Sequence, residues 1–193
     1  MHNLDKHYWE NRYQNNQTSW DVGEISTPMQ LYIDQLTDKN LKILIPGAGN
    51  GYEFDYLINK GFKNVYVVDI AIQPIENLKE KHPLFSKNII QNDFFELFDT
   101  FDLILEQTFF CALSPNLRPS YVEKMASLLN RNGKLVGLFF NFPLTESGPP
   151  YGGSKLEYQN LFSSYFTIKS LEQSYNSIKP RKNRELFFIF EKK

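Results

Sequence analysis

The chain of 193 residues is 41% hydrophobic and 16% aromatic, and it carries a formal net charge of −1 at pH 7. This composition is too apolar for a disordered chain, and the near-neutral charge gives no basic field of the kind that nucleic-acid binding requires. The single cysteine, Cys111, excludes an internal disulfide, and no apolar stretch has signal-peptide or membrane-span length, so we expect a soluble, cytoplasmic monomer of one domain, residues 1–193.

From residue 41 onward, short apolar segments alternate with amphipathic ones. The apolar segments predict strands and the amphipathic ones predict helices, with Gly61, Pro83 and Gly133 as helix stops. The expected strands are 41–45, 64–70, 88–93, 102–106 and 135–140, and the expected helices run from about 51 to 60, from 74 to 81 and from 119 to 130. Such alternation predicts a doubly wound, mainly parallel α/β sheet.

Both ends of the chain depart from this alternation. Residues 165–171 and 185–191 predict two strands with no helix between them, which indicates an antiparallel hairpin. The first 40 residues are rich in Trp, Tyr, Asn and Gln, and we expect this segment to lie across one edge of the sheet. Residues 41–193 are then the α/β core.

Three glycines follow the first strand, within the sequence ILIPGAGNGYEF of residues 43–54. Gly47, Gly49 and Gly51 allow a sharp turn and a close approach of the backbone to a ligand at the carboxyl edge of the sheet. Their spacing, G-x-G-x-G, departs from the dinucleotide fingerprint G-x-G-x-x-G, and no Lys-Ser/Thr pair follows, which excludes a Walker-type loop. A purely structural turn stays open as an alternative.

Polar groups follow the next two strands. Asp69 ends the second strand, where a carboxylate can accept hydrogen bonds from both hydroxyls of an adenosine ribose; its structural alternative is a helix N-cap. Asp93 follows the third strand and could hold an adenine amino group, with Phe94 covering the ring; the alternative there is a polar turn. Three consecutive strand ends with suitable groups favour a ligand that contains a nucleoside.

Six stretches in order along most of the chain share one family pattern. The element W-x10-W-D-x-G of residues 9–23 and the stretch FFCALSPNLRP are far more specific than the glycine loop. The matching stretches are YWENRYQNNQTSWDVGEISTP (8–28), LIPGAGNGYEFDYL (44–57), VVDI (67–70), NDFF (92–95), FDLILEQTFFCALSPNLRP (101–119) and GPPY (148–151). In these stretches the chain resembles the thiopurine S-methyltransferase-like family of S-adenosylmethionine-dependent methyltransferases, nearest to its plant halide and thiocyanate (thiol) methyltransferase branch.

This resemblance implies a class I methyltransferase fold, a Rossmann-like sheet of seven strands with a reversed terminal hairpin, and S-adenosyl-L-methionine as the cofactor. It also implies that residues 1–40 form an N-terminal lid segment and that Tyr151 has a catalytic, acceptor-side position. Gln107 stands where relatives have Tyr or Arg. The implied cofactor-binding residues are Trp9, Tyr13 and Trp20 of the lid, Gly47 and Gly49 at the methionine part, Asp69 at the ribose, Asp93 and Phe94 at the adenine, and Gln107.

The chemistry implied is methyl transfer to a small soft nucleophile, such as a thiol, thiocyanate, hydrosulfide or halide, by in-line displacement. Such a nucleophile needs removal of water more than it needs a general base. His2, His7 and His82 lie outside the strand-end cluster and are expected at the surface. Glu106 is the best candidate base, and its alternatives are to orient the cofactor's ammonium group or to be structural. Cys111 is expected to be a buried filler, and the Cys and His spacings give no metal site.

Other functions stay open at this point. Within enzymes, the alternatives are an O- or N-methyltransferase for another small molecule and a nicotinamide-dependent dehydrogenase, although the latter would favour G-x-G-x-x-G. A module that binds S-adenosylmethionine without catalysis is a third alternative. The basic run 179–184 is expected to be a solvated turn of the hairpin, with a bias of the site rim toward anionic acceptors as its alternative.

Overall fold

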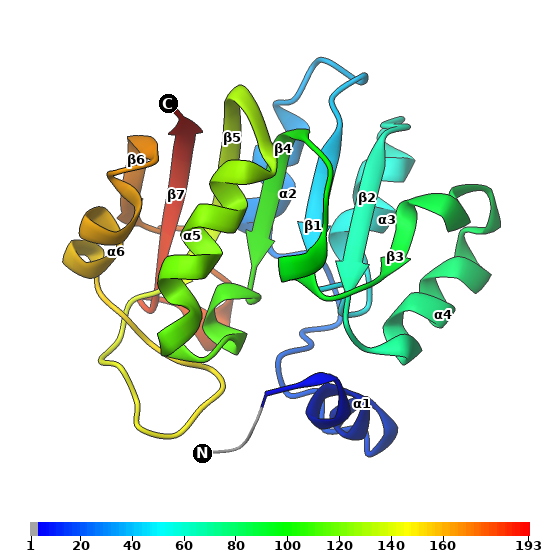
Figure 1. The fold of residues 1–193 in the computed structure, drawn as a ribbon, viewed down its shortest axis with the longest axis horizontal. Helices are drawn as coiled ribbons and strands as arrows, with labels where there is room; N and C mark the ends of the chain where they lie inside the picture. The colour runs from blue at the N-terminus through cyan, green and yellow to red at the C-terminus, as the bar shows by residue number, and fades with distance from the viewer. Residues whose placement is uncertain (1–3) are drawn as a thin grey trace.

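A seven-stranded sheet runs through the computed structural model, which describes residues 4–193 (Figure 1). Its order is β3-β2-β1-β4-β5-β7-β6; neighbours from β3 to β5 are parallel, and β7 is antiparallel to both β5 and β6. The strands are β1 (Ile43–Pro46), β2 (Val65–Asp69), β3 (Ile89–Gln91), β4 (Phe101–Gln107), β5 (Leu129–Phe140), β6 (Phe166–Gln173) and β7 (Glu185–Lys192). This topology confirms the doubly wound sheet and the antiparallel terminal pair.

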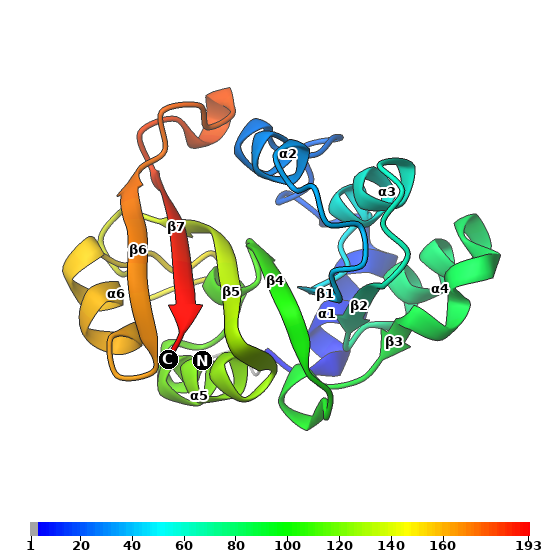
Figure 2. The same ribbon diagram turned by 90° about the horizontal axis from the view of Figure 1, so that it is seen from above.

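Helices cover both faces of the sheet (Figure 2). One face carries α2 (Thr27–Asp34), α3 (Tyr52–Asn59) and α4 (Ile72–Lys81), and the other carries α5 (Arg118–Ser127) and α6 (Lys155–Phe162). α1 (Lys6–Gln14) lies beyond the carboxyl edge of the sheet, below the arrowheads of β1, β2 and β4 in Figure 1. Short 3-10 helices complete the fold: η1 (Pro83–Asn88), η2 (Phe94–Glu96), η3 (Phe110–Ala112), η4 (Pro115–Leu117) and η5 (Lys179–Arg181).

An apolar cluster on each face holds the helices to the sheet. On the α5 and α6 face, Phe139 of β5 stacks on Phe188 of β7 with ring centroids 4.0 Å apart, and Phe162 of α6 lies 5.4 Å from Phe139. On the opposite face, Met29 of α2 and Leu57 of α3 are fully buried. Burial of apolar surface stabilises the fold by roughly 25 cal/mol per Å². These two clusters therefore hold the strands in place, and with them the positions of the strand ends.

Several elements differ from the sequence-based expectation. α5 ends at Ser127 instead of residue 130, because Leu129 pairs with Phe101 and begins β5. The register then shifts before Lys134 pairs with Leu103, so Gly133 lies within this irregular part of β5 and does not stop a helix. The sequence pattern also does not predict α2 or α6. α2 packs on a face of the sheet, so this part of the first 40 residues belongs to the helical layer.

The histidines follow the expectation only in part. His2 lies outside the described residues, and His7 is exposed. The side chain of His82 is only 15% exposed, and its Nε2 lies 2.6 Å from Oδ1 of Asp55. A surface role is therefore wrong for His82, which joins α3 to the end of α4. Within residues 4–193, no helix combines the length and apolarity that a membrane crossing would need.

Candidate functional site

The glycine loop after β1 adopts a backbone that requires glycine. Gly47, Gly49 and Gly51 have φ of 77°, 51° and 74°, a region that L side chains rarely adopt. A Cβ at Gly47 would come within 2.9 Å of the Phe109 ring, whereas a Cβ at Gly49 would meet nothing within 4 Å. The loop therefore packs tightly on one side at Gly47 and is open at Gly49.

Asp69 at the end of β2 holds this loop in place. Its Oδ2 accepts from the N–H of Ala48 and its Oδ1 from the N–H of Ala71, each at 2.8 Å. Burial raises the pKa of the carboxyl group, and these backbone hydrogen bonds oppose that effect. The N-cap of α4 is Ala71, so the N-cap interpretation of Asp69 is wrong in its literal form. The carboxylate instead links the ends of β1 and β2. It lies at the carboxyl end of the second strand, where the sequence predicts a contact with a ribose.

Aromatic side chains of the N-terminal segment gather beside Asp69. Trp9 and Tyr13 lie four residues apart on α1, and both rings meet Trp20 edge-on, with centroids 5.7 and 5.6 Å away. Trp9 and Tyr13 therefore share one face of α1. Burial and the negative charges of Asp69 and Asp21 raise the pKa of Tyr13, because they disfavour its phenolate. We call residues 6–26 the lid segment, since they lie over the carboxyl ends of the strands.

Asp21 fastens the lid segment to the glycine loop. Its Oδ2 accepts from the Asn50 side chain at 2.5 Å, and its Oδ1 accepts from the Tyr52 hydroxyl at 2.8 Å. The same Oδ1 accepts from the N–H of Gly23, which closes a turn in the lid segment itself. The W-D-x-G element thus has a structural reason: the carboxylate positions the Trp20 turn against the loop.

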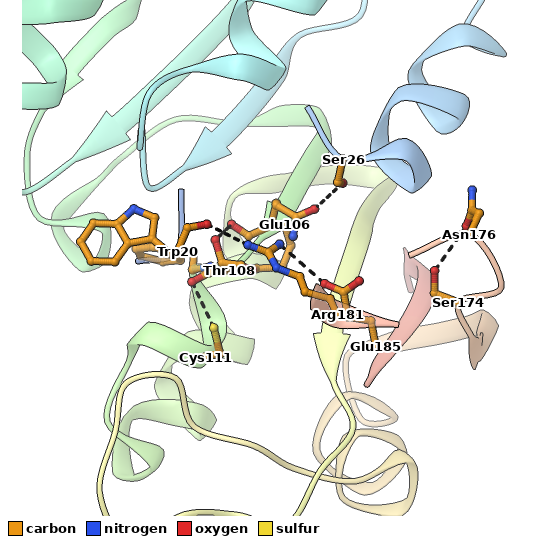
Figure 3. A network of polar contacts seen from close by, with 11 residues as sticks. Trp20, Ser26, Glu106, Thr108, Cys111, Ser174, Asn176, Arg181 and Glu185 are labelled. Carbon is orange, nitrogen blue, oxygen red and sulfur yellow. Dashed lines mark hydrogen bonds and ion pairs between the residues drawn. The ribbon is translucent and has the colours of Figure 1, made fainter. Parts of the chain in front are cut away.

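Arg181 fastens the lid segment to the β6–β7 loop (Figure 3). Its Nη2 donates to the carbonyl of Trp20 at 2.9 Å, and its Nη1 lies 3.6 Å from Oε1 of Glu185. Arg181 is only 8% exposed and Glu185 only 2%. The solvated-turn interpretation of the basic run is therefore wrong for Arg181, whereas its neighbours Lys179 and Lys182 are exposed.

Gln107 meets the lid segment at the end of β4. Its Oε1 accepts from the Ser26 hydroxyl at 2.8 Å, and its buried Nε2 has no partner within hydrogen-bond distance. The next residue, Thr108, has φ of 62°, an uncommon value for a residue with a branched Cβ. β4 therefore ends in a strained turn next to Ser26 of the lid segment. The cofactor contact predicted for Gln107 stays a prediction.

The residues expected at an adenine lie at the end of β3. Asp93 is exposed, and its Oδ1 caps η2 by accepting from the N–H of Phe95 at 2.8 Å. Phe94 is 4% exposed and packs edge-on against Phe109, with centroids 5.1 Å apart. Asp93 therefore has the structural role of a polar turn, while the adenine contacts of both residues stay predictions.

Glu106 has a structural environment. It is fully buried, and it accepts from the N–H groups of Phe109 and Phe110 at 2.8 and 3.0 Å and from the Tyr121 hydroxyl at 2.6 Å. Burial raises its pKa to about 7, and these hydrogen bonds oppose the shift. Through these hydrogen bonds, Glu106 anchors the turn after β4. Cys111 is buried, as expected for a filler, and its Sγ lies 3.3 Å from the carbonyl of Thr108.

Tyr151 belongs to the loop between β5 and α6, residues 141–154, which we call the acceptor-side loop. Its N–H donates to the carbonyl of Cys111 at 2.8 Å, and its ring packs so closely on Gly148 that a Cβ there would lie 2.7 Å away. Phe109 thus lies against the glycine loop, and Cys111, two residues later, holds Tyr151. The structure brings the predicted acceptor-side residue to the same edge of the sheet as the predicted cofactor residues.

Sequence reasoning missed three residues that build this site. Asp21 and Ser26 stand in the N-terminal family pattern, so their position beside Trp20 was the available signal. Arg181 had a weaker signal, a basic run 161 residues after Trp20, whose partner depends on where β6 and β7 lie in the sheet.

Comparisons with known proteins agree with this arrangement. A family model described as Thiopurine S-methyltransferase (TPMT) matches residues 4–192. The chain is 30% identical over 184 residues to "Probable thiol methyltransferase 2" of Arabidopsis thaliana, covering 92% of this chain and 81% of the relative. It is 28% identical over 185 residues to "Thiocyanate methyltransferase 1" of Brassica oleracea, with the same coverage.

A solved structure with a similar fold is the Burkholderia thailandensis 1,6-didemethyltoxoflavin-N1-methyltransferase with bound 1,6-didemethyltoxoflavin and S-adenosylhomocysteine. The TM-score is 0.75 at 19% identity, over 97% of this chain and 86% of that one. At this identity the likeness shows the fold alone, and it agrees with the expected class I methyltransferase sheet.

Proposed function

From the premise that the chain belongs to the thiopurine S-methyltransferase family, we propose that it transfers a methyl group from S-adenosylmethionine to a small soft nucleophile. The observation that carries this proposal is the convergence of the lid aromatics, Asp69 and the glycine loop at one edge of the sheet. The printed names of the thiol and thiocyanate methyltransferases support the acceptor class.

The residues at this edge fit S-adenosylmethionine. The open side of the glycine loop at Gly49 leaves room for a ligand against the backbone. The Asp69 carboxylate accepts from the N–H groups of Ala48 and Ala71, and the backbone N–H groups of Ile70 and Gly49 also act on it, so ribose hydroxyls would share its oxygens with these groups. Trp9, Tyr13 and Trp20 would then lie over the ligand.

The residues of this chain position and enclose the reactants. When bound, S-adenosylmethionine supplies a methyl group that is activated by a positively charged sulfur. Aromatic rings such as Trp9 and Tyr13 can hold a cation with about 0.5–2 kcal/mol each and exclude water. Holding an acceptor in line about 3 Å from the methyl group lowers the barrier by roughly 7–11 kcal/mol at best.

A soft acceptor also agrees with the state of the nearby acidic group. Glu106 is buried and its oxygens accept three hydrogen bonds, so it is poorly placed to take a proton from an acceptor. A thiolate, thiocyanate, hydrosulfide or halide requires no proton removal at the moment of attack. We assign to Tyr151 a contact with this acceptor, since its backbone is anchored beside the turn after β4.

Turnover with isotopically labelled S-adenosylmethionine tests the proposal. The acceptor panel is iodide, thiocyanate, hydrosulfide and benzenethiol, with a catechol and an aliphatic amine as contrasting arms. We expect labelled product from at least one soft nucleophile and none from the catechol or the amine.

A thermal shift with S-adenosylmethionine, S-adenosylhomocysteine and NAD separates the remaining functions, because a ligand that binds only the native state raises stability. Stabilisation by a sulfur cofactor without transfer to any soft nucleophile would contradict the proposed acceptor. Stabilisation by NAD alone would contradict the methyltransferase itself.

A further inference from the structure

Arg118, the first residue of α5, lies in a side-chain cluster that no proposed contact with cofactor or acceptor includes. Its side chain is only 4% exposed. Nη2 donates to the carbonyl of Gly152 at 2.7 Å, and Nη1 pairs with Oε1 of Glu157 on α6. The guanidinium carbon also lies 4.9 Å from the ring centroid of Phe110. One buried cation therefore joins α5, α6, η3 and the acceptor-side loop.

These contacts hold Tyr151 and the two residues that follow it. The residue after it, Gly152, is held by Arg118, and Gly153 donates its N–H to the carbonyl of Phe142 at 2.8 Å. Tyr151 itself donates to the carbonyl of Cys111, the neighbour of the Phe110 ring on which Arg118 rests. The backbone of three consecutive residues is thus fixed, and Arg118 provides the one charged contact among these three.

Gly152, whose carbonyl accepts from Arg118, lies in a closely packed part of the loop. A Cβ at Gly152 would lie 2.3 Å from the carbonyl oxygen of Phe142, so only glycine fits this backbone position. Arginine suits the other side, since its planar fork can serve two acceptors at once and still stack on a ring. A lysine ammonium is a point charge and cannot reproduce all three contacts.

We propose that Arg118 is a positioning residue, which fixes the acceptor-side loop so that Tyr151 and the methyl acceptor stay aligned with the methyl group. This inference rests on the proposed methyl transfer, and it assigns to Arg118 no contact with either reactant. A displacement of about 1 Å in a reacting pair can cost about a hundredfold in rate, so the rigidity of this loop matters for turnover.

The test compares R118K with two other variants in the complete chain. G152A disturbs the same loop through the Phe142 carbonyl, and R131K changes an exposed arginine at the start of β5. Hydrogen exchange measures protection of the Tyr151 and Gly153 amides without any turnover. Steady-state kinetics with hydrosulfide and benzenethiol give KM and kcat, and titration gives the affinity for S-adenosylmethionine.

We expect R118K and G152A to lose amide protection in residues 148–153 and to lower kcat/KM for the acceptor about tenfold to a hundredfold. Affinity for S-adenosylmethionine stays within about twofold, because the contacts of Arg118 with Gly152, Glu157 and Phe110 include no proposed cofactor residue. R131K matches the wild type. The inference is overturned if R118K keeps wild-type protection in the loop, or if cofactor affinity falls in parallel with acceptor kinetics. Lack of turnover by the wild type would instead contradict the proposed function, and the exchange data would still decide the role of Arg118.

Discussion

The lid segment and the acceptor-side loop lie at the same edge of the sheet but are held in different ways. Within the lid segment, α1 has no fully buried residue, and polar side chains of Asp21 and Ser26 link the segment to the body. In the acceptor-side loop, Gly152 and Gly153 are buried and the backbone groups of residues 151–153 are hydrogen-bonded, whereas residues 143–147 are exposed. Segments with few buried contacts open at low free-energy cost. We therefore expect the lid segment to open more readily than residues 151–153 of the acceptor-side loop.

The largest expected effect is a loss of cofactor affinity on the lid side of this comparison. Asp69→Ala removes the carboxylate that the Ala48 and Ala71 N–H groups share. Hydrogen bonds to a charged group contribute about 1.5–3 kcal/mol, so we expect affinity for S-adenosylmethionine to fall about a hundredfold. Isothermal titration measures this, with Asp69→Asn as the smaller change. Unchanged affinity in Asp69→Ala would remove this residue from the ribose role.

Glu106→Gln tests how the buried carboxyl group in the turn after β4 makes the stability of the fold depend on pH. The folded pKa of about 7 lies above the ordinary 4.5, so the stability from this group is fully present below pH 4.5 and is lost as pH rises through 7. The full difference is about 3 kcal/mol as an upper bound. Glutamine does not titrate, so the variant should keep stability between pH 5 and 8 better than the wild type. Urea unfolding across this range checks it, and parallel curves would contradict the assignment.

Trp20→Ala tests the mobility of the lid segment. The substitution removes two edge-on aromatic contacts, each contributing about 0.5–1.5 kcal/mol beyond area burial. We expect faster proteolysis within residues 6–26 and a weakening of cofactor affinity of about tenfold. The control is Tyr175→Ala, since Tyr175 is 87% exposed. Equal protease resistance in both variants would argue against an opening lid.

The smallest expected effect separates backbone strain from ligand contact. Gly49 and Gly61 both have positive φ, 51° and 87°, and a Cβ at either would meet nothing within 4 Å. Alanine at either position should cost about 1–2 kcal/mol of stability. Thermal unfolding measures the loss of stability in each variant, and titration measures its affinity for the cofactor. Both variants should lose similar stability, and only Gly49→Ala should also lose affinity for the cofactor. Equal binding by both variants would leave the loop as a structural turn.

The sequence predicts those parts of the fold and site that depend on neighbouring residues, and it does not predict contacts between segments far apart in the chain. The strands β1, β2 and β4 and the stops at Gly61 and Pro83 follow from apolar runs and backbone preferences of neighbouring residues. α2 was missed because its apolar residues meet partners on the sheet that lie far along the chain. For the site, the family resemblance implied the roles of Trp9 and Tyr13. The partnership of Arg181 with Trp20 was not, because no local pattern records which strand ends become neighbours.

The contact of Arg181 with the Trp20 carbonyl joins two segments that lie 161 residues apart. During synthesis the lid segment leaves the ribosome early, but its guanidinium partner follows only when η5 has been made. At roughly 5–20 residues per second, about 8–32 seconds separate the two events. The partners of Asp21 in the glycine loop, Asn50 and Tyr52, are synthesised much earlier. The contact of the lid segment with Arg181 is thus expected to be the last of its polar contacts to form.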